Sequence, residues 1–308
     1  MVNVKEIKAV KLAPFTLMSS SIGAILAFIA AIIIFITFGT IASFIPQAQG
    51  IKAFMTFAGA ALIIIYPISA FFISLAVNFF SVLLYNGLVS RLGGIKLGLD
   101  GNELTNIPVV SFALILASIE AIWAFIIGIF LTAAILPAIA GLSGSIPTIS
   151  QAIANATNMT NATLPTGQAL AAGGVFLAIF LIIVLPIIAF IAGFIGNALT
   201  AIFYNYVAVR VAKVQLNFTP TTGAFDLTSI PVVPAALSIA IVFAIWGFIR
   251  GLGSLASLSA NGDPTGGVLS LIGMTVGYFI LYFIITALGA IFYNYLAPRI
   301  GSIGLELE

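Results

Sequence analysis

Long apolar runs separated by short polar segments dominate the chain, and each run is long enough to cross a lipid bilayer. About 20 consecutive apolar residues span the hydrocarbon core as a helix. We therefore expect six transmembrane helices, at residues 17–45, 53–86, 107–139, 169–205, 229–252 and 267–294. Pro67 falls inside the second of them, where a proline is expected to kink the helix.

Three of these apolar runs end in the same motif, a Tyr-Asn pair followed five residues later by an arginine. The motif residues are Tyr85, Asn86 and Arg91; Tyr204, Asn205 and Arg210; and Tyr293, Asn294 and Arg299. Tyrosine is typical of the membrane–water boundary, asparagine can end a helix, and arginine can meet anionic headgroups. The simplest interpretation of the motif is architectural, as a marker of helix ends.

Each motif is followed by a short segment in which apolar and polar residues alternate, which is typical of a β-strand. The apolar positions are Ile95, Leu97 and Leu99; Val214, Leu216 and Phe218; and Ile303, Leu305 and Leu307. The N-terminal segment, with Val10 and Leu12, supplies a fourth strand. We expect the four short strands to form a small cytoplasmic β-sheet whose apolar face caps the helices and whose free edges can pair with another subunit.

The alignment of the segments with one another indicates three tandem repeats. Residues 103–110 align with residues 226–233, and residues 120–123 align with residues 243–246. The sequence thus predicts an all-α polytopic membrane protein of six transmembrane helices, built as three helical-hairpin repeats within one integrated membrane domain. We expect the repeats at residues 1–90, 91–209 and 210–308.

The hairpin that ends at Tyr85-Asn86 and continues into Gly93-Gly94-Ile95-Lys96-Leu97 resembles a small actinobacterial membrane domain of unknown function. That domain is a two-helix hairpin that ends in Y-N and continues into G-G-I-x-V-x-L. In the other two copies Ala212-Lys213 and Gly301-Ser302 replace the Gly-Gly pair. The resemblance covers nearly the whole chain as three copies, and it implies an architecture and no activity.

Composition indicates that most of the surface faces lipid, because 62% of the residues are hydrophobic and only 6% are charged. Soluble domains carry about 25% charged residues. The net charge of +2 gives no indication of nucleic-acid binding. Cysteine and histidine are both absent, which excludes disulfides, thiolate metal sites and histidine-based catalysis. We therefore expect no cofactor, no metal and no enzymatic activity.

The polar stretch 141–168 is expected to be an extracytoplasmic loop, because it contains three glycosylation sequons. Their acceptor residues are Asn155, Asn158 and Asn161. With this loop outside, both termini are expected in the cytoplasm. Eight of the ten basic residues then lie on the cytoplasmic side, and Lys52 and Arg250 lie outside. This distribution fits the positive-inside rule and predicts a multi-pass protein of the cell membrane.

Glu120 is the one ionisable acid that the pattern places deep in a span, about 18–20 Å along its helix at 1.5 Å per residue. Ser74 or Asn78 could hydrogen-bond to it from the second helix. Asn78, Asn197 and Thr286 recur eight residues before the three motif asparagines. These polar side chains either form a proton or cation site in a conduction path, or link the helices by hydrogen bonds.

Two functions remain open from the sequence. The leading hypothesis is a non-enzymatic structural or scaffolding membrane protein, surrounded by membrane lipids, that associates through its cytoplasmic strands with itself or with a membrane or cytoplasmic partner. The alternative is a channel or secondary transporter for a small ion or solute, which uses Glu120 with Asn78, Asn197 and Thr286. A lipid-modifying enzyme is a third hypothesis, which no motif in the chain favours.

Overall fold

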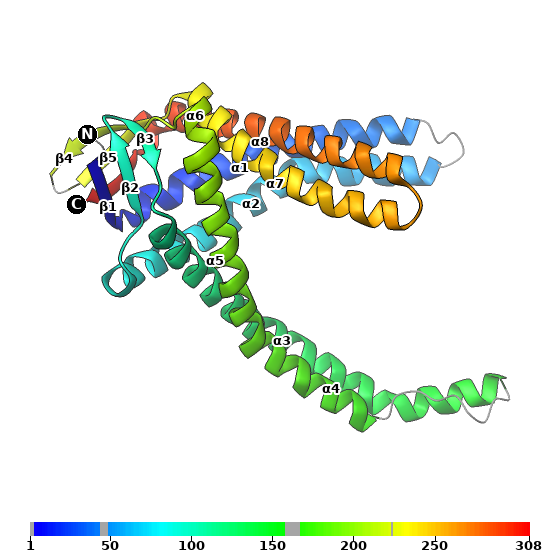
Figure 1. Ribbon diagram of the computed structural model, residues 1–308. Helices are drawn as coiled ribbons and strands as arrows, with labels where there is room; N and C mark the ends of the chain where they lie inside the picture. The colour runs from blue at the N-terminus through cyan, green and yellow to red at the C-terminus, as the bar shows by residue number, and fades with distance from the viewer. Residues whose placement is uncertain (1–2, 44–48, 158–166, 223) are drawn as a thin grey trace. The chain divides into compact units, whose positions relative to one another are not determined.

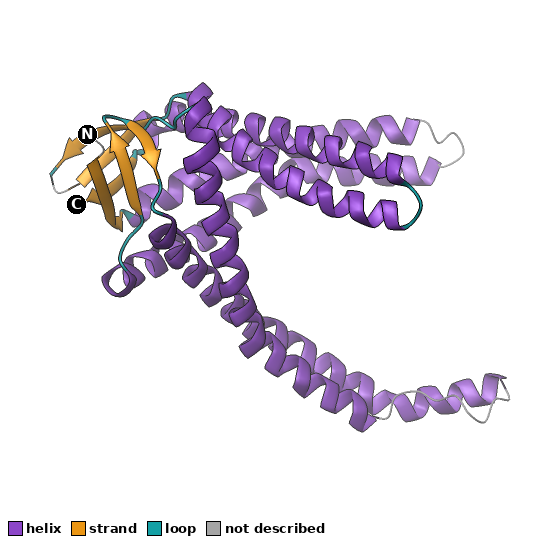
Figure 2. Cartoon of the chain, viewed as in Figure 1, coloured by secondary structure: helices purple, strands orange, loops and turns teal. Residues whose placement is uncertain are grey.

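The computed structural model describes residues 3–43, 49–157, 167–222 and 224–308 (Figure 1). The chain divides into two compact units. The first unit contains residues 1–115 and 198–308, and the second contains residues 116–197. Helices make up most of both units, and a small antiparallel sheet lies in the first (Figure 2).

Within the described residues, six helical stretches are long and apolar enough to cross a membrane, as the sequence predicts. Many of their large apolar side chains are exposed; Ile64 and Ile73, for example, are both 64% exposed. A surface of this kind is stable against lipid, whereas in water it would associate. The six stretches are Leu12–Ile41, Thr56–Leu92, Val109–Leu142, Gln168–Val211, Val232–Ala260 and Pro264–Ile300.

The helices extend further than the apolar pattern predicts, because they continue into polar sequence. The helices are α1 Leu12–Ser43, α2 Gln49–Leu92, α3 Val109–Thr157, α4 Gly167–Ile179, α5 Leu185–Phe203, α6 Val209–Val211, α7 Val232–Ala260 and α8 Pro264–Ile300. Two π-helical turns, Phe180–Val184 and Tyr204–Ala208, link α4 to α5 and α5 to α6. The first turn stands just before Pro186, whose missing N–H and bulky ring disfavour the ordinary hydrogen bond to the residue four positions earlier.

The expected loop at residues 141–168 is wrong over most of its described length, because α3 continues through it to Thr157. Pro137 and Pro147 lie inside this helix, where each removes one hydrogen bond without ending it. The stretch is polar overall, so apolar length does not predict a helix there, although its apolar residues recur at helical spacing. The residues that carry this spacing are Leu142, Ile146, Ile149 and Ile153.

The sheet has six strands rather than the four expected. They are β1 Asn3–Val10, β2 Lys96–Asp100, β3 Glu103–Asn106, β4 Asn217–Thr221, β5 Ala224–Ser229 and β6 Ile303–Leu307, in the order β3-β2-β1-β6-β5-β4. The alternating pattern misses β3 and β5, which return from β2 and β4 as hairpins. Gly101, with a φ of +60°, supplies the left-handed residue of the turn between β2 and β3.

The two end strands of this order are joined by the residues just before β4, so the sheet closes on itself. The Leu104 N–H donates to the Val214 carbonyl at 2.8 Å, and the Leu216 N–H donates to the Asn102 carbonyl at 2.8 Å. These bonds flank an antiparallel bridge between residues 103 and 215. The edges are therefore paired at residues 102–104 and 214–216, while β4 remains an end strand of the sheet beyond this bridge.

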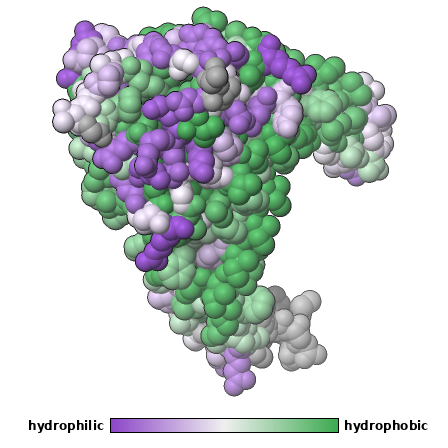
Figure 3. Space-filling model, turned by 60° about the vertical axis from the view of Figure 1, so that its left-hand side comes forward, coloured by the Kyte–Doolittle hydropathy of each residue, from purple (hydrophilic) through white to green (hydrophobic). Residues whose placement is uncertain are grey.

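The apolar side of this closed sheet packs on helices of the first unit. Leu97, Leu99 and Leu104 are buried with Tyr204 and Val242, so β2 and β3 contact the π-helical turn at Tyr204 and α7. A second cluster buries Leu227 of β5 against α1 and α8. Figure 3 shows hydrophilic residues gathered at the strands and hydrophobic residues covering the helices.

Gly94 provides a test of the packing of β2 against β1. A Cβ at this position would overlap the carbonyl oxygen of Ile7, whereas a Cβ at Gly87 in α2 meets no atom within 4 Å. We predict that Gly94→Ala lowers the free energy of unfolding by about 1–3 kcal/mol through overpacking. Gly87→Ala, the matched control, should leave stability unchanged or raise it slightly.

Thermal unfolding of the two purified variants in detergent measures this difference. Equal unfolding midpoints for Gly94→Ala and Gly87→Ala would contradict the close approach of the two strands.

Candidate functional site

The first Tyr-Asn motif holds two strand segments against the end of α2 by four hydrogen bonds. The Tyr85 hydroxyl donates to the Ile7 carbonyl at 2.7 Å and accepts from the Ile95 N–H at 3.0 Å. The Asn86 amide donates to the Val10 carbonyl at 2.9 Å, and its oxygen accepts from the Val10 N–H at 2.9 Å. We name this set of four bonds a Tyr-Asn clamp.

The same four bonds recur at the other two motifs. The Tyr204 hydroxyl binds the Leu104 carbonyl and the Val214 N–H, and the Asn205 amide binds both backbone groups of Ile107. The Tyr293 hydroxyl binds the Leu227 carbonyl and the Ile303 N–H, and the Asn294 amide binds both backbone groups of Ile230. All four asparagine bonds in these two clamps are 2.8 Å long.

The clamps correct the expected roles of tyrosine and asparagine. The three tyrosines are at most 6% exposed, so their hydroxyls meet backbone groups rather than headgroups. The asparagines do not end their helices, because their side chains bind a neighbouring segment while their own backbone stays helical; α2 continues to Leu92 and α8 to Ile300. These two helices end instead at Gly93 and Gly301, which have φ of +78° and +96°.

An acidic residue precedes each carbonyl that the tyrosine hydroxyl contacts, and sequence reasoning missed all three. The Gly94 N–H donates to Glu6 at 2.7 Å, and this bond lowers the pKa of the Glu6 carboxyl. The Lys213 ammonium donates to Glu103 at 2.7 Å, which lowers the pKa of the Glu103 carboxyl. Asp226 lies 3.7 Å from the Lys11 ammonium. The sequence signal that could have found them is an acidic residue directly before an apolar residue, which recurs in all three clamped segments.

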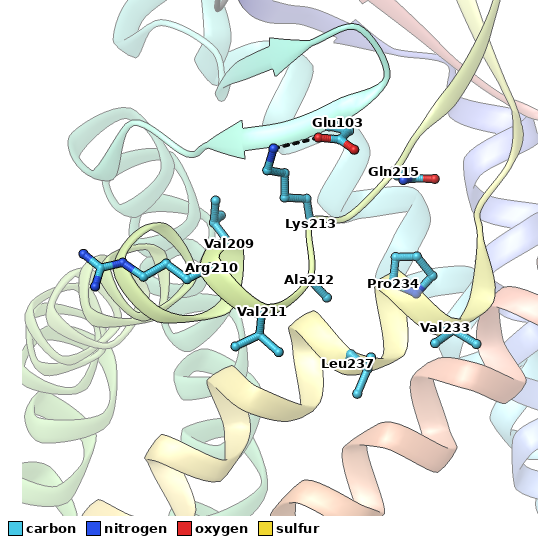
Figure 4. A pocket seen from close by; sticks show the side chains of 10 residues that line it. All are labelled: Glu103, Val209, Arg210, Val211, Ala212, Lys213, Gln215, Val233, Pro234 and Leu237. Carbon is cyan, nitrogen blue, oxygen red and sulfur yellow. Dashed lines mark hydrogen bonds and ion pairs between the residues drawn. The ribbon is translucent and has the colours of Figure 1, made fainter.

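Two pockets lie where the end of one long apolar helical stretch meets the start of the next. The first has a volume of about 400 Å³ and contains Arg210, the arginine of the second motif (Figure 4). We name it the Arg210 pocket. Its lining residues are Glu103, Val209, Arg210, Val211, Ala212, Lys213, Gln215, Val233, Pro234 and Leu237. The second, of about 430 Å³, lies between Leu92 and Leu114, and we name it the Leu92 pocket.

The three motif arginines are all exposed at the ends of their helices. Arg299 is held against its own helix, because its guanidinium lies 3.8 Å from the centre of the Tyr295 ring and donates to the Tyr295 carbonyl at 2.5 Å. Arg210 lines the pocket that bears its name. Equivalent sequence positions thus have different surroundings in the fold.

Glu120 lies in the second unit, where its hydrogen-bond partner is Asn197. The Asn197 amide donates to the Glu120 carboxylate at 3.0 Å. The carboxylate also lies against Gly193, one helical turn before Asn197, and a Cβ there would overlap it. Glu120 itself is exposed. The arrangement combines two of the residues singled out from the sequence and adds Gly193.

The other intramembrane candidates lie in the first unit. The Ser74 hydroxyl lies against Gly23 of α1, where an added Cβ would be 3.3 Å from it. Asn78 and Thr286 are half-buried on α2 and α8. Of the three sequon residues, Asn155 falls within α3, while Asn158 and Asn161 lie outside the described residues, so glycosylation stays a prediction.

A cluster of aromatic residues surrounds Arg250 on the α7–α8 hairpin. The Arg250 guanidinium donates to the Tyr278 hydroxyl, and the Phe243 and Tyr282 rings stack with their centres 3.6 Å apart. With Trp246 these residues line a pocket of about 300 Å³. Tyrosine, tryptophan and arginine together are typical of a membrane–water boundary.

The importance of the clamps can be tested with two tyrosines that are close in sequence. We predict that Tyr204→Phe lowers the free energy of unfolding by about 1–3 kcal/mol, because the Leu104 carbonyl and the Val214 N–H lose their hydroxyl partner. Tyr206→Phe is the control, because Tyr206 is 64% exposed. Thermal unfolding midpoints in detergent compare the two, and an equal effect would contradict the role assigned to the clamp.

The motif residues therefore act in the fold through backbone hydrogen bonds, and Glu120 with Asn197 forms a separate polar pair. In the described parts of the chain, no three or more aspartate or glutamate side chains come together as a group that could hold a metal ion. No protein-family model, no curated protein and no solved structure matches this chain.

Proposed function

We propose that the protein is a non-enzymatic structural component of a membrane, in which a closed sheet joins three helical hairpins. The observation that carries this proposal is the use of the motif's polar groups. Each tyrosine hydroxyl has two backbone partners, and each asparagine amide binds both backbone groups of one residue. Groups occupied in this way serve the fold, whereas a catalytic or binding site needs groups that can reach a ligand.

The proposal includes the three hairpin repeats expected from the sequence. In the segment that each clamp binds, an acidic residue comes directly before the residue whose carbonyl binds tyrosine. The residue bound by asparagine follows three positions later. These triplets are Glu6, Ile7 and Val10; Glu103, Leu104 and Ile107; and Asp226, Leu227 and Ile230. Equal spacing and equal hydrogen bonds at three places support a repeated unit.

The membrane boundaries that we propose follow from the positions of arginine and tyrosine. Arg299 and Tyr278 are 21 residues apart on α8, which is about 31 Å at 1.5 Å per residue. This length matches the hydrocarbon core of about 30 Å. Eight of the ten basic residues, all except Lys52 and Arg250, lie on strands or at the helix ends beside them. That distribution supports a cytoplasmic sheet, cytoplasmic termini and insertion in the cell membrane.

Self-association through the strands, the mode expected from the sequence, stays a prediction, and the bridge between residues 103 and 215 leaves a shorter edge for it. We therefore assign association to the transmembrane helices, at the pair formed by Glu120 and Asn197. Glu120 stands 11 residues into the α3 span, about 17 Å from Val109. An exposed carboxyl at that depth is costly in lipid, and a second copy of the chain that covers it would remove this cost.

Photobleaching of singly labelled protein in liposomes tests the association. Wild-type protein should show two or more bleaching steps that persist as the protein-to-lipid ratio falls, and Glu120→Leu should shift the counts toward single steps. Thr286→Val, which removes a half-buried polar group from another span, is the matched control. Single steps for the wild type at every ratio would contradict the proposal.

The second candidate function is a channel or secondary transporter for a small ion or solute, which the same exposed, hydrogen-bonded carboxyl favours. It predicts a saturable proton or monovalent-ion flux in liposomes that Glu120→Gln abolishes, because the amide cannot exchange a proton. No flux above that of protein-free vesicles, with the protein shown to be folded and inserted, would reject this alternative and favour the structural function.

A further inference from the structure

The Arg210 pocket lies at a junction between two membrane-spanning stretches. Val211 is the last residue of one stretch, and Val232 is the first residue of the next. The pocket is open and has a volume of about 400 Å³, within the range of small-molecule sites. In the placement proposed above, this junction is the cytoplasmic boundary of the membrane.

The pocket has an apolar side and a polar side. Val211 and Val233 are 66% and 57% exposed, and with Leu237 they form the apolar side. Figure 4 shows the Lys213 ammonium directed at Glu103 on the opposite side, while the Arg210 guanidinium extends away from this pair. An amphipathic ligand with an anionic head suits such a lining.

The lining carries a net positive charge. Lys213 and Glu103 neutralise each other at 2.7 Å, and the exposed Arg210 adds one positive charge. The segment that carries Lys213 is attached to α7, because the hydroxyl of the fully buried Ser238 donates to the Ala212 carbonyl at 2.6 Å. The lysine is therefore held at the pocket by the fold.

The corresponding positions in the other two copies lack this lysine. Counted from the motif asparagine, Gly94 and Ser302 stand where the Arg210 pocket has Lys213. The Leu92 pocket contains Gly94, whose backbone N–H donates to the Glu6 carboxylate. Among the three equivalent positions, the second is the one that offers a cationic side chain.

We propose that the Arg210 pocket binds one anionic phospholipid of the cytoplasmic leaflet. Lys213 contacts the phosphate of the headgroup, and the exposed Arg210 side chain turns from its present direction to reach the same phosphate. An acyl chain follows Val211 and Val233 into the membrane. The inference deepens the proposed function by naming a lipid partner. It rests on the proposed membrane insertion and does not depend on self-association.

Native mass spectrometry of the full chain in detergent, with equal amounts of phosphatidylglycerol and phosphatidylcholine, tests the site. Wild-type protein should retain phosphatidylglycerol preferentially. Arg210→Gln should weaken this binding about fivefold, the usual effect of one basic residue near an anionic headgroup. Glu103→Gln should strengthen it, because Lys213 loses its neutralising partner.

Arg91→Gln is the matched control, because Arg91 has the same motif position and is exposed but does not line this pocket. Equal phosphatidylglycerol binding by the wild type, Arg210→Gln and Glu103→Gln would overturn the site. Displacement of the lipid by millimolar inorganic phosphate would overturn the lipid assignment in favour of a free phosphate ligand.

The opposite effects expected of the Arg210 and Glu103 variants separate a binding role from a loss of folding, which would weaken binding in both. The photobleaching counts form an independent readout. Loss of the lipid preference with unchanged oligomeric counts rejects the lipid site alone, whereas single bleaching steps with a retained preference reject the proposed association alone.

Discussion

The hydrogen bonds between motif side chains and the backbone of the connecting segments are the interaction on which the rest of the structure depends. Ile107 and Ile230 lie between a strand and a helix, where neither element supplies partners for their N–H and C=O groups. An asparagine amide offers one donor and one acceptor, as a peptide group does, so it replaces the missing strand at these residues. Buried backbone groups without a hydrogen-bond partner would each cost free energy. The clamps therefore allow the chain to pass from sheet to long apolar helix in a short distance.

The six spans, the strands β1, β2 and β6 and the start of β4 could be predicted from the sequence, because apolar length and two-residue alternation are local signals. The strand expected at residues 214–218 overlaps β4 only at its last two residues. The strands β3 and β5 could not be predicted, because each is a short hairpin return whose alternation is too brief to stand out: β3 has four residues and β5 has six. Glu103–Asn106 has one buried apolar residue, Leu104, whose N–H donates to a carbonyl 110 positions later, at Val214. The continuation of α3 to Thr157 was missed for a different reason. Its helical spacing of apolar residues is present, but serine, threonine and asparagine between them lower the apolar content.

The candidate site was located by repetition, whereas its geometry was not predictable. Repetition singles out Tyr85 and Asn86 but does not tell whether their polar atoms face headgroups or backbone, since both environments suit them. Depth along a helix predicts that Glu120 lies deep in a span but leaves its rotation about the helix axis open. The sequence therefore suggested Ser74 or Asn78 as its partner and did not identify Asn197. The Arg210 pocket likewise arises from tertiary structure, because Arg210 and Val233 come from different helices.

Hydrogen–deuterium exchange of individual backbone amides tests the central role of the clamps most directly. Six N–H groups donate to motif side chains, and most of them lie outside regular strands and helices, so their protection depends on the clamps. They belong to Val10, Ile95, Ile107, Val214, Ile230 and Ile303. The structure predicts slow exchange at all six in the folded protein. Exchange as fast as in an unstructured peptide at Ile107 and Ile230 would contradict this role of the clamps.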